Sequence, residues 1–183
     1  MALRIYGNRL LKTPPGDLSR PTLGRVREAL FNIWQGEIEG CRWLDLCTGS
    51  GAMGAEALCR GASLVVGIEQ AAPALRVIEE NWRKVAQPEQ EFRLIRGDVR
   101  KRVIQLEGQR FDRIYFDPPY AGGLYEPVLE AIARLNLLAE GGQLAIEHDR
   151  QSLPLLPSGL TSKRVKTYGR TSLTFCDRAS HSI

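Results

Sequence analysis

The amino-acid sequence predicts an α/β fold in which a mainly parallel sheet is covered by helices on both faces. Two observations predict it. Short apolar runs alternate with stretches of helical spacing from residue 42 onward, and glycines or prolines stand where these elements would begin or end. The chain has 183 residues, which suits one compact unit better than two. Its 43% hydrophobic and 25% charged residues are ordinary for a globular protein.

The N-terminal part of the chain is predicted to form a short β-hairpin and a helix. Two apolar runs flank Gly7-Asn8, a dipeptide that favours turns, and are predicted as strands at 3–6 and 10–12. Thr22 is a candidate N-cap for the helix that follows. The apolar positions of this helix recur at helical spacing up to Trp34, which we expect in the core.

We expect residues 1–35 to be an extension of an α/β domain that spans residues 36–183. Seven strands are predicted in this domain, at 43–47, 64–69, 92–95, 113–116, 143–147, 163–168 and 172–176. Helices are predicted near 52–60, 73–86, 99–106 and 126–139. The last two strands flank Gly169-Arg170 and would form an antiparallel hairpin at the sheet edge. Ligands of such sheets bind beyond the carboxyl ends of the strands.

Acidic residues lie at or just after the carboxyl ends of the first three predicted strands of the domain, and the first of these acids precedes a glycine-rich loop. Gly49 and Gly51 begin a GxGxxG pattern, which lets the backbone approach a ligand closely. Asp45, just before this loop, would repel a pyrophosphate and would suit a cationic amino group. Glu69 can accept hydrogen bonds from ribose hydroxyls, and Asp98 can accept one from an adenine amino group. Singly, each acid could be a surface charge or a helix cap; together they predict an adenosine-containing cofactor.

The fourth predicted strand is followed directly by Asp117-Pro118-Pro119-Tyr120. A rigid turn would explain the two prolines but not the acid before them and the aromatic ring after them. The Asp117 carboxylate and the Pro118 carbonyl could each accept one N–H of an exocyclic amino group, and Tyr120 offers a stacking face for a base. Such a site would aim the nitrogen lone pair at a methyl donor for direct displacement. The sequence therefore predicts methyl transfer from S-adenosylmethionine to the amino group of a nucleic-acid base.

The motifs together resemble those of the amino-directed class I methyltransferases: DLCTGSG followed by GAEAL, then Glu69, then DPPY. Over residues 4–176 the chain is similar to one family in particular, the RsmD-like bacterial methyltransferases. The segments that carry this similarity are RIYGNRLLKTPPG, RPTLGRVREALF and YGRT. Two small departures are Cys47-Thr48, where Phe-Ala is more usual, and Tyr120, where Phe is common.

The resemblance implies a Rossmann-like class I methyltransferase domain with a seven-stranded sheet. It also implies that the methyl group goes to N2 of a guanine in 16S rRNA, within the small ribosomal subunit or its assembly intermediate. Gly49, Ser50 and Gly51 would line the cofactor, Glu69 would hold its ribose, and Asp98 would lie by its adenine. Asp117, Pro118 and Tyr120 would hold the target base, which would have to be presented by a loop or flipped out of its stack.

Positive charge is concentrated near the N-terminus. Residues 1–30 hold six basic and two acidic side chains, although the whole chain carries only +4. Charge of this kind favours a phosphate backbone, although a solvated surface would also explain it. With the resemblance, it indicates an RNA-binding set of Arg9, Arg20, Thr22, Arg25 and Arg27. A second basic stretch, close to the C-terminus, comprises Lys163, Arg164, Lys166 and Arg170.

Several classes of protein are disfavoured by the composition. No apolar run approaches the roughly 20 residues of a membrane span, and the N-terminus lacks the apolar core of a secretory signal. The four cysteines form no CxxC pair, and the two histidines lie far from most of them. We therefore expect reduced thiols, no metal site and a cytoplasmic location.

Other functions remain open at this stage. A nucleotide-dependent dehydrogenase shares the glycine loop, but it does not explain DPPY. A non-catalytic rRNA-binding assembly factor would explain the basic segments, but not an intact DPPY. Adenine N6 or cytosine N4 of DNA or RNA could also be the target, because DPPY recognises an amino group and not a particular base. Enzymes that modify protein glutamine are less favoured, because they carry Asn where this chain has Asp117.

Overall fold

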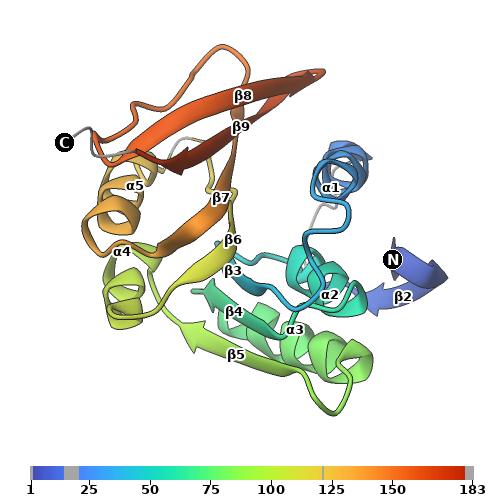
Figure 1. Ribbon diagram of the computed structural model, residues 1–183. Helices are drawn as coiled ribbons and strands as arrows, with labels where there is room; N and C mark the ends of the chain where they lie inside the picture. The colour runs from blue at the N-terminus through green and yellow to red at the C-terminus, as the bar shows by residue number, and fades with distance from the viewer. Residues whose placement is uncertain (1, 15–20, 121, 180–183) are drawn as a thin grey trace.

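The structure is a computed structural model that describes residues 2–14, 21–120 and 122–179; for Ala2 and residues 21–23 only the backbone is considered. Seven strands form one twisted sheet in the order β5-β4-β3-β6-β7-β9-β8 (Figure 1). They are β3 (Arg42–Leu46), β4 (Leu64–Glu69), β5 (Glu91–Arg96), β6 (Phe111–Phe116), β7 (Leu138–Asp149), β8 (Leu160–Tyr168) and β9 (Thr171–Arg178). The strands from β3 to β7 pair in parallel, and β9 is antiparallel to both β7 and β8. The predicted sheet and its edge hairpin are confirmed.

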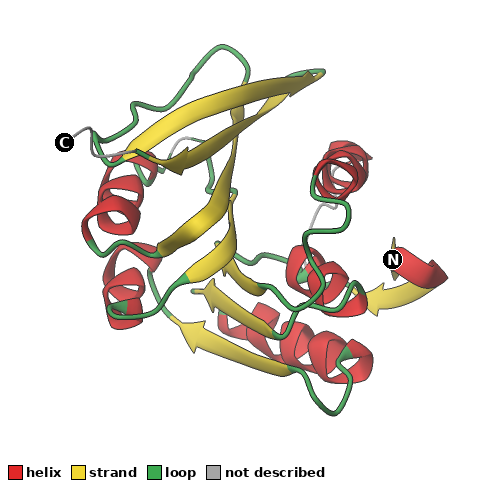
Figure 2. Ribbon diagram, viewed as in Figure 1, coloured by secondary structure: helices red, strands yellow, loops and turns green. Residues whose placement is uncertain are grey.

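Helices cover both faces of the sheet, as Figure 2 shows. One face carries α1 (Pro21–Ile33), α2 (Ala52–Cys59) and α3 (Ala72–Val85), and the other carries α4 (Val99–Arg102), the 3-10 turn η2 (Val103–Leu106) and α5 (Tyr125–Arg134). A hydrophobic cluster lies under each group. The aromatic rings of Phe31 and Trp43 stack at 5.2 Å, and Trp34 meets Trp43 edge-on at 5.6 Å. Trp34 is 1% exposed, which confirms it as a core residue.

Three predicted elements differ from the structure. The helix expected at 99–106 is one α-helical turn followed by a 3-10 turn. The helix expected at 126–139 ends at Arg134, because β7 begins at Leu138. Thr22 is not the N-cap of α1, because it lies within the helix, which is described from Pro21 onward.

The N-terminal hairpin packs against the helices of the main domain. It consists of β1 (Ala2–Ile5), a 3-10 turn η1 (Tyr6–Asn8) and β2 (Arg9–Lys12). Ile5 and Leu11 are buried in the same hydrophobic cluster as α2 and α3. The buried amide of Asn81 on α3 accepts a hydrogen bond from the Lys12 backbone N–H and donates one to the Lys12 carbonyl, each at 2.9 Å. The extension therefore shares its core with the rest of the chain.

Candidate functional site

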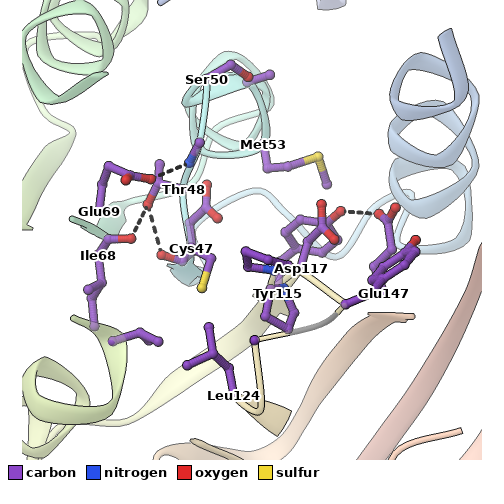
Figure 3. A pocket seen from close by; sticks show the side chains of 18 of the residues that line it. Cys47, Thr48, Ser50, Met53, Ile68, Glu69, Tyr115, Asp117, Leu124 and Glu147 are labelled. Carbon is purple, nitrogen blue, oxygen red and sulfur yellow. Dashed lines mark hydrogen bonds between the residues drawn. The ribbon is translucent and has the colours of Figure 1, made fainter. Parts of the chain in front are cut away.

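The carboxyl ends of the parallel strands open into a cavity of about 1390 Å³, part of which Figure 3 shows. Small-ligand pockets usually measure about 300–1,000 Å³, so this cavity has room for a nucleoside cofactor and a second group. It brings together eight of the predicted cofactor and catalytic residues: Asp45, Gly49, Ser50, Glu69, Asp98, Asp117, Pro118 and Tyr120. Arg25 and Arg27 of α1 also line it, as does the turn at Gly169-Arg170 between β8 and β9.

Gly51 belongs to the predicted cofactor set but lies behind the loop and not among the lining residues. Its φ is +76°, which favours glycine, and an added Cβ would lie 2.9 Å from Cγ2 of Ile78. Its carbonyl accepts a 2.7 Å hydrogen bond from the indole N–H of Trp82. Gly54, one turn into α2, is even closer to α3, because an added Cβ would lie 2.3 Å from Cζ2 of Trp82. These two glycines permit close packing of the loop and helix against α3.

Asp45 presents a buried carboxylate to the cavity. The residue is 1% exposed, and its carboxylate accepts one long hydrogen bond, of 3.3 Å, from the backbone N–H of Gly54. Burial raises the pKa of Asp45 to about 7; the Gly54 N–H opposes this rise and the charge of Glu69 adds to it. A buried carboxylate that receives only a long hydrogen bond from the protein suits a cationic group of a ligand. The amino group of S-adenosylmethionine fits this requirement.

Glu69 links two backbone segments at the cavity wall. Its carboxylate accepts 2.8 Å hydrogen bonds from the backbone N–H groups of Gly49 and Ala71. Because a carboxylate has about four acceptor positions, these bonds fix its orientation and leave capacity for ribose hydroxyls. The structure therefore holds Glu69 in place, in a manner that fits the predicted ribose contact.

Asp98 is the N-cap of α4. It accepts a 2.9 Å hydrogen bond from the Arg100 backbone N–H and forms an ion pair with the Arg100 side chain. These bonds from Arg100 lower the pKa of Asp98 to about 2. A helix cap is one of the alternatives that the sequence leaves open, and Asp98 has this structural role. Its predicted adenine contact stays a prediction.

Asp117 and its neighbours lie at the ends of β6 and β7. Phe116 is paired with Ile146, so Asp117 and Glu147 follow at adjacent positions of neighbouring strands. Tyr115 donates a hydrogen bond from its hydroxyl to Glu147, and both side chains are buried. Figure 3 shows Asp117 beside this pair. Tyr120 is 37% exposed, and its hydroxyl lies 3.2 Å from that of Thr171.

Sequence reasoning did not identify Glu147 or Tyr115 as site residues. The sequence did contain an indication for Glu147, because it is the last residue of the fifth predicted strand. The other candidate acids also lie at or just after strand ends. Tyr115 carried no such signal, because an aromatic residue inside a buried strand is expected in the core. Burial and the nearby carboxylates of Asp117 and Glu147 raise the pKa of Tyr115 well above its usual value. Its hydroxyl therefore remains a hydrogen-bond donor.

The predicted RNA-binding residues are not equivalent in the structure. Arg25 is exposed and lines the cavity. Arg9 is exposed outside the cavity, with a guanidinium N–H 2.8 Å from the sulfur of Cys59. Arg20 and the side chain of Thr22 lie outside what the structure describes.

Arg27 requires a correction, because its side chain is only 6% exposed. Its guanidinium donates to Glu56 at 2.8 Å and to the carbonyl of Arg4 at 2.7 Å. A buried guanidinium must be paired, and this one is occupied by groups of the protein. Arg27 therefore joins α1 to α2 and to the hairpin, and we remove it from the RNA-binding set.

Two further features bear on the predicted class of site. Among the residues described, no group of three or more His, Cys, Asp or Glu side chains is arranged to hold a metal ion. No helix in the described part of the chain is both long enough and apolar enough to cross a membrane.

The fold and the site define a class I S-adenosylmethionine-dependent methyltransferase. The solved structure of Putative methyltransferase yhhF from Escherichia coli superimposes with a TM-score of 0.84 at 26% identity, and the match covers 99% of this chain and 100% of that one. A family model described as Conserved hypothetical protein 95 matches residues 3–177, and the chain belongs to this family.

Named relatives agree with this assignment. Putative rRNA methyltransferase YlbH from Bacillus subtilis is 32% identical over 169 residues, which cover 90% of this chain and 91% of that protein. Ribosomal RNA small subunit methyltransferase D from Escherichia coli is 28% identical over 181 residues, which cover 96% and 90%. The resemblance to the RsmD-like family is confirmed.

Proposed function

We propose that this protein transfers a methyl group from S-adenosylmethionine to the N2 amino group of a guanine in 16S rRNA of the small ribosomal subunit. The observation that carries the proposal is the position of Asp117-Pro118-Pro119-Tyr120 in the same cavity as Asp45 and Glu69. The relatives named as ribosomal RNA methyltransferases support rRNA as the substrate class. In this proposal residues 1–35 are an RNA-contacting extension of the methyltransferase domain at 36–183, and the enzyme works in the cytoplasm.

The cofactor would be held by groups that the cavity already orients. Asp45 would pair with its amino group, Glu69 would accept from its ribose, and Asp98 would lie by its adenine. The backbone of Gly49 and Ser50 would line it. When bound, S-adenosylmethionine supplies an electrophilic methyl group on a sulfonium.

The DPPY segment would prepare the amino nitrogen of the base. That nitrogen is a poor nucleophile, because its lone pair is delocalised into the ring. If the Asp117 carboxylate and the Pro118 carbonyl each accept one N–H, the nitrogen is fixed and its lone pair turns out of the ring plane. The nitrogen held by Asp117 and Pro118 would then accept the methyl group and lose one amino proton. Because these acceptors are already in position, little reorganisation is needed during the reaction. We expect most of the rate acceleration to come from this preset geometry.

Glu147 favours guanine over the other bases that carry an exocyclic amino group. Beside that group guanine has a protonated ring nitrogen, N1–H, whereas adenine and cytosine have an unprotonated acceptor there. A carboxylate accepts hydrogen bonds and donates none when it is ionised. Glu147 lies next to Asp117 at the strand ends, so the two acids can accept from N1–H and from the amino group of one guanine. Adenine or cytosine would instead place an acceptor against Glu147.

The test is methyl transfer to small subunits isolated from cells that lack this protein. With radiolabelled S-adenosylmethionine, we expect label in 16S rRNA, at N2 of one guanine. Label at adenine N6 or cytosine N4 would contradict the proposed base. Cofactor binding without any transfer would favour an RNA-binding assembly factor, and binding of NAD in place of S-adenosylmethionine would favour a dehydrogenase.

A further inference from the structure

β8 is the exposed edge of the seven-stranded sheet and carries a concentration of positive charge. Arg164 and Lys166 are exposed, as is Arg170 in the turn that leads to β9. Charged side chains on an edge strand also prevent edge-to-edge association of sheets, so charge alone does not define a binding surface. What distinguishes these residues is where the strand leads and which face they occupy.

β8 leads to the mouth of the catalytic cavity. Because β9 is antiparallel to both β7 and β8, these two strands run in the same direction. The carboxyl end of β8 therefore lies at the same end of the sheet as the carboxyl ends of the parallel strands, where the cofactor and DPPY residues gather. Tyr168, Gly169 and Arg170 line the cavity directly. β8 also contacts α1, and in Figure 1 the hairpin of β8 and β9 extends towards that helix.

The basic residues lie on the face of the strand that carries α1. Arg164 is paired with Phe175 of β9, and the next residue on the same face, Lys166, is paired with Leu173. Phe175 and Leu173 both belong to the hydrophobic cluster under α1. Tyr168 is the third residue on this face. Alternate residues of a strand are about 6.6 Å apart, a spacing comparable to that of successive phosphates in a nucleic-acid strand.

Among the described residues, no nearby carboxylate neutralises these cations. Within the described ranges, no carboxylate lies within 4.0 Å of Arg164, Lys166 or Arg170, whereas Lys12, Arg27, Arg60, Arg83, Arg100 and Arg113 have such partners. The Arg164 guanidinium lies 4.9 Å from the centre of the Phe175 ring, which orients it. Lys163 differs, because it lies at a bulge and lines a separate depression with Glu140 and Asp177.

We propose that Arg164, Lys166 and Arg170 bind phosphates along the RNA strand that flanks the target base and lead it into the cavity, where Tyr168 offers a stacking face. We call these three residues the β8 row. This inference rests on the proposed function. RNA fits the β8 row because unpaired cations interleaved with an aromatic ring suit a phosphate backbone with unstacked bases.

The test compares two double variants that each remove two positive charges from the same hairpin. Lys166→Ala with Arg170→Ala alters the β8 row, and Lys163→Ala with Arg178→Ala alters the opposite end of β8 and β9. Binding of a fluorescent single-stranded RNA of mixed sequence is measured from 50 to 200 mM salt. Removal of each phosphate-binding cation should reduce the slope of log affinity against log salt by about 0.7. We expect a reduction of about 1.4 for the first variant and little change for the second.

Methyl transfer to small subunits distinguishes failure of this inference from failure of the proposed function. If wild-type protein methylates the subunits, the variant in the β8 row should need a several-fold higher subunit concentration, while its affinity for S-adenosylhomocysteine is unchanged. If that variant keeps the wild-type salt slope, or if the control variant loses as much of the slope, the proposed role of the β8 row is wrong. If wild-type protein is inactive but the slope falls as expected, the proposed function fails and the RNA surface stands.

Discussion

The carboxylate of Asp45 lies in the cavity wall, 1% exposed, with one long hydrogen bond. Burial raises its pKa to about 7, so the folded protein binds a proton there more tightly than the unfolded chain does. Between about pH 4 and pH 7 the folded state therefore holds the extra proton. The free energy of unfolding should fall as pH rises through that range, as far as this group contributes.

We predict that cofactor affinity depends on pH through Asp45. Only the ionised carboxylate pairs with an ammonium group, so affinity for S-adenosylhomocysteine should fall below pH 7, approaching tenfold per pH unit. Calorimetry between pH 5.5 and 8 measures it, and Asp45→Asn should bind weakly at every pH. Affinity of wild-type protein that stays constant over this range would show that Asp45 does not pair with the ligand.

We predict that Asp117→Ala nearly abolishes methyl transfer without loss of cofactor affinity. Removal of a preset acceptor costs about 3–4 kcal/mol of barrier, or at least a hundredfold in rate. Asp117→Asn keeps one acceptor oxygen and should retain weak activity if orientation dominates. Single-turnover transfer to small subunits is the measurement, with cofactor binding measured in parallel. Rates near those of wild-type protein in Asp117→Ala would exclude the proposed DPPY mechanism.

We predict that Glu147 sets the preference for guanine. With 2-aminopurine in place of the target guanine, the amino group is kept but N1–H is lost. Wild-type protein should then methylate the RNA roughly 10- to 150-fold more slowly, the equivalent of about 1.5–3 kcal/mol. Glu147→Gln can donate to the bare ring nitrogen and should reduce this ratio. Tyr115→Phe removes the hydrogen bond to Glu147 but keeps its carboxylate, so the ratio should persist. An unchanged ratio in Glu147→Gln would refute base reading by this residue.

At the scale of elements, α2 and α3 are held together by a close contact between Gly54 and Trp82. The indole ring lies against the backbone of α2, and its N–H donates to the Gly51 carbonyl at 2.7 Å. The loop that carries Gly49 therefore derives its position partly from α3. A sequence pattern that is usually associated with ligand binding here also serves packing between helices.

We predict that Gly54→Ala destabilises the protein by about 1–3 kcal/mol, although alanine is the better helix former by about 1 kcal/mol. An alanine Cβ would lie 2.3 Å from Cζ2 of Trp82, so the helices must separate. The matched control is Gly24→Ala in α1, where an added Cβ meets no atom of the described residues within 4 Å. This control should be neutral or slightly stabilising in denaturant unfolding. Equal effects of the two substitutions would show that contact with Trp82 is unimportant.

At the scale of the whole molecule, the N-terminal extension and the main domain are joined by buried polar groups. Glu56 of α2 accepts hydrogen bonds from Arg27 of α1 and from Arg60, and Arg27 also donates to the carbonyl of Arg4 in the hairpin. These bonds join three segments that are distant in the sequence. Together with the shared hydrophobic cluster, they indicate that the extension unfolds with the domain.

We predict that Arg27→Ala mainly reduces stability, whereas Arg25→Ala mainly reduces RNA binding. Loss of Arg27 leaves Glu56 buried with one partner fewer, which should cost about 2–4 kcal/mol of stability. Arg25 is exposed at the cavity, so its removal should change stability by less than about 0.5 kcal/mol but weaken RNA binding. Chemical denaturation and RNA titration of both variants measure this. A stable Arg27→Ala protein with weakened RNA binding would return Arg27 to the RNA surface.

The order of the main elements and the acids at the strand ends could be predicted from local sequence. These features depend on local spacing: alternating apolar runs define strands and helices, and the residue after each parallel strand lies at one known edge of the sheet. Asp45, Glu69 and Asp117 could therefore be assigned to one cavity from their positions along the chain. Asp117-Pro118-Pro119-Tyr120 then indicated methyl transfer to an amino group, and the family resemblance added the guanine and 16S rRNA.

Tertiary structure alone decided which of these side chains are buried and which partners they meet. Arg27 and Arg25 are two residues apart in one basic segment, yet one lies in a buried ion pair and the other is exposed. The hydrogen bond between Tyr115 and Glu147 joins two strands, and the close contact of Gly54 joins two helices. Such pairings depend on how distant segments pack together, and the periodicity of one segment does not contain that information.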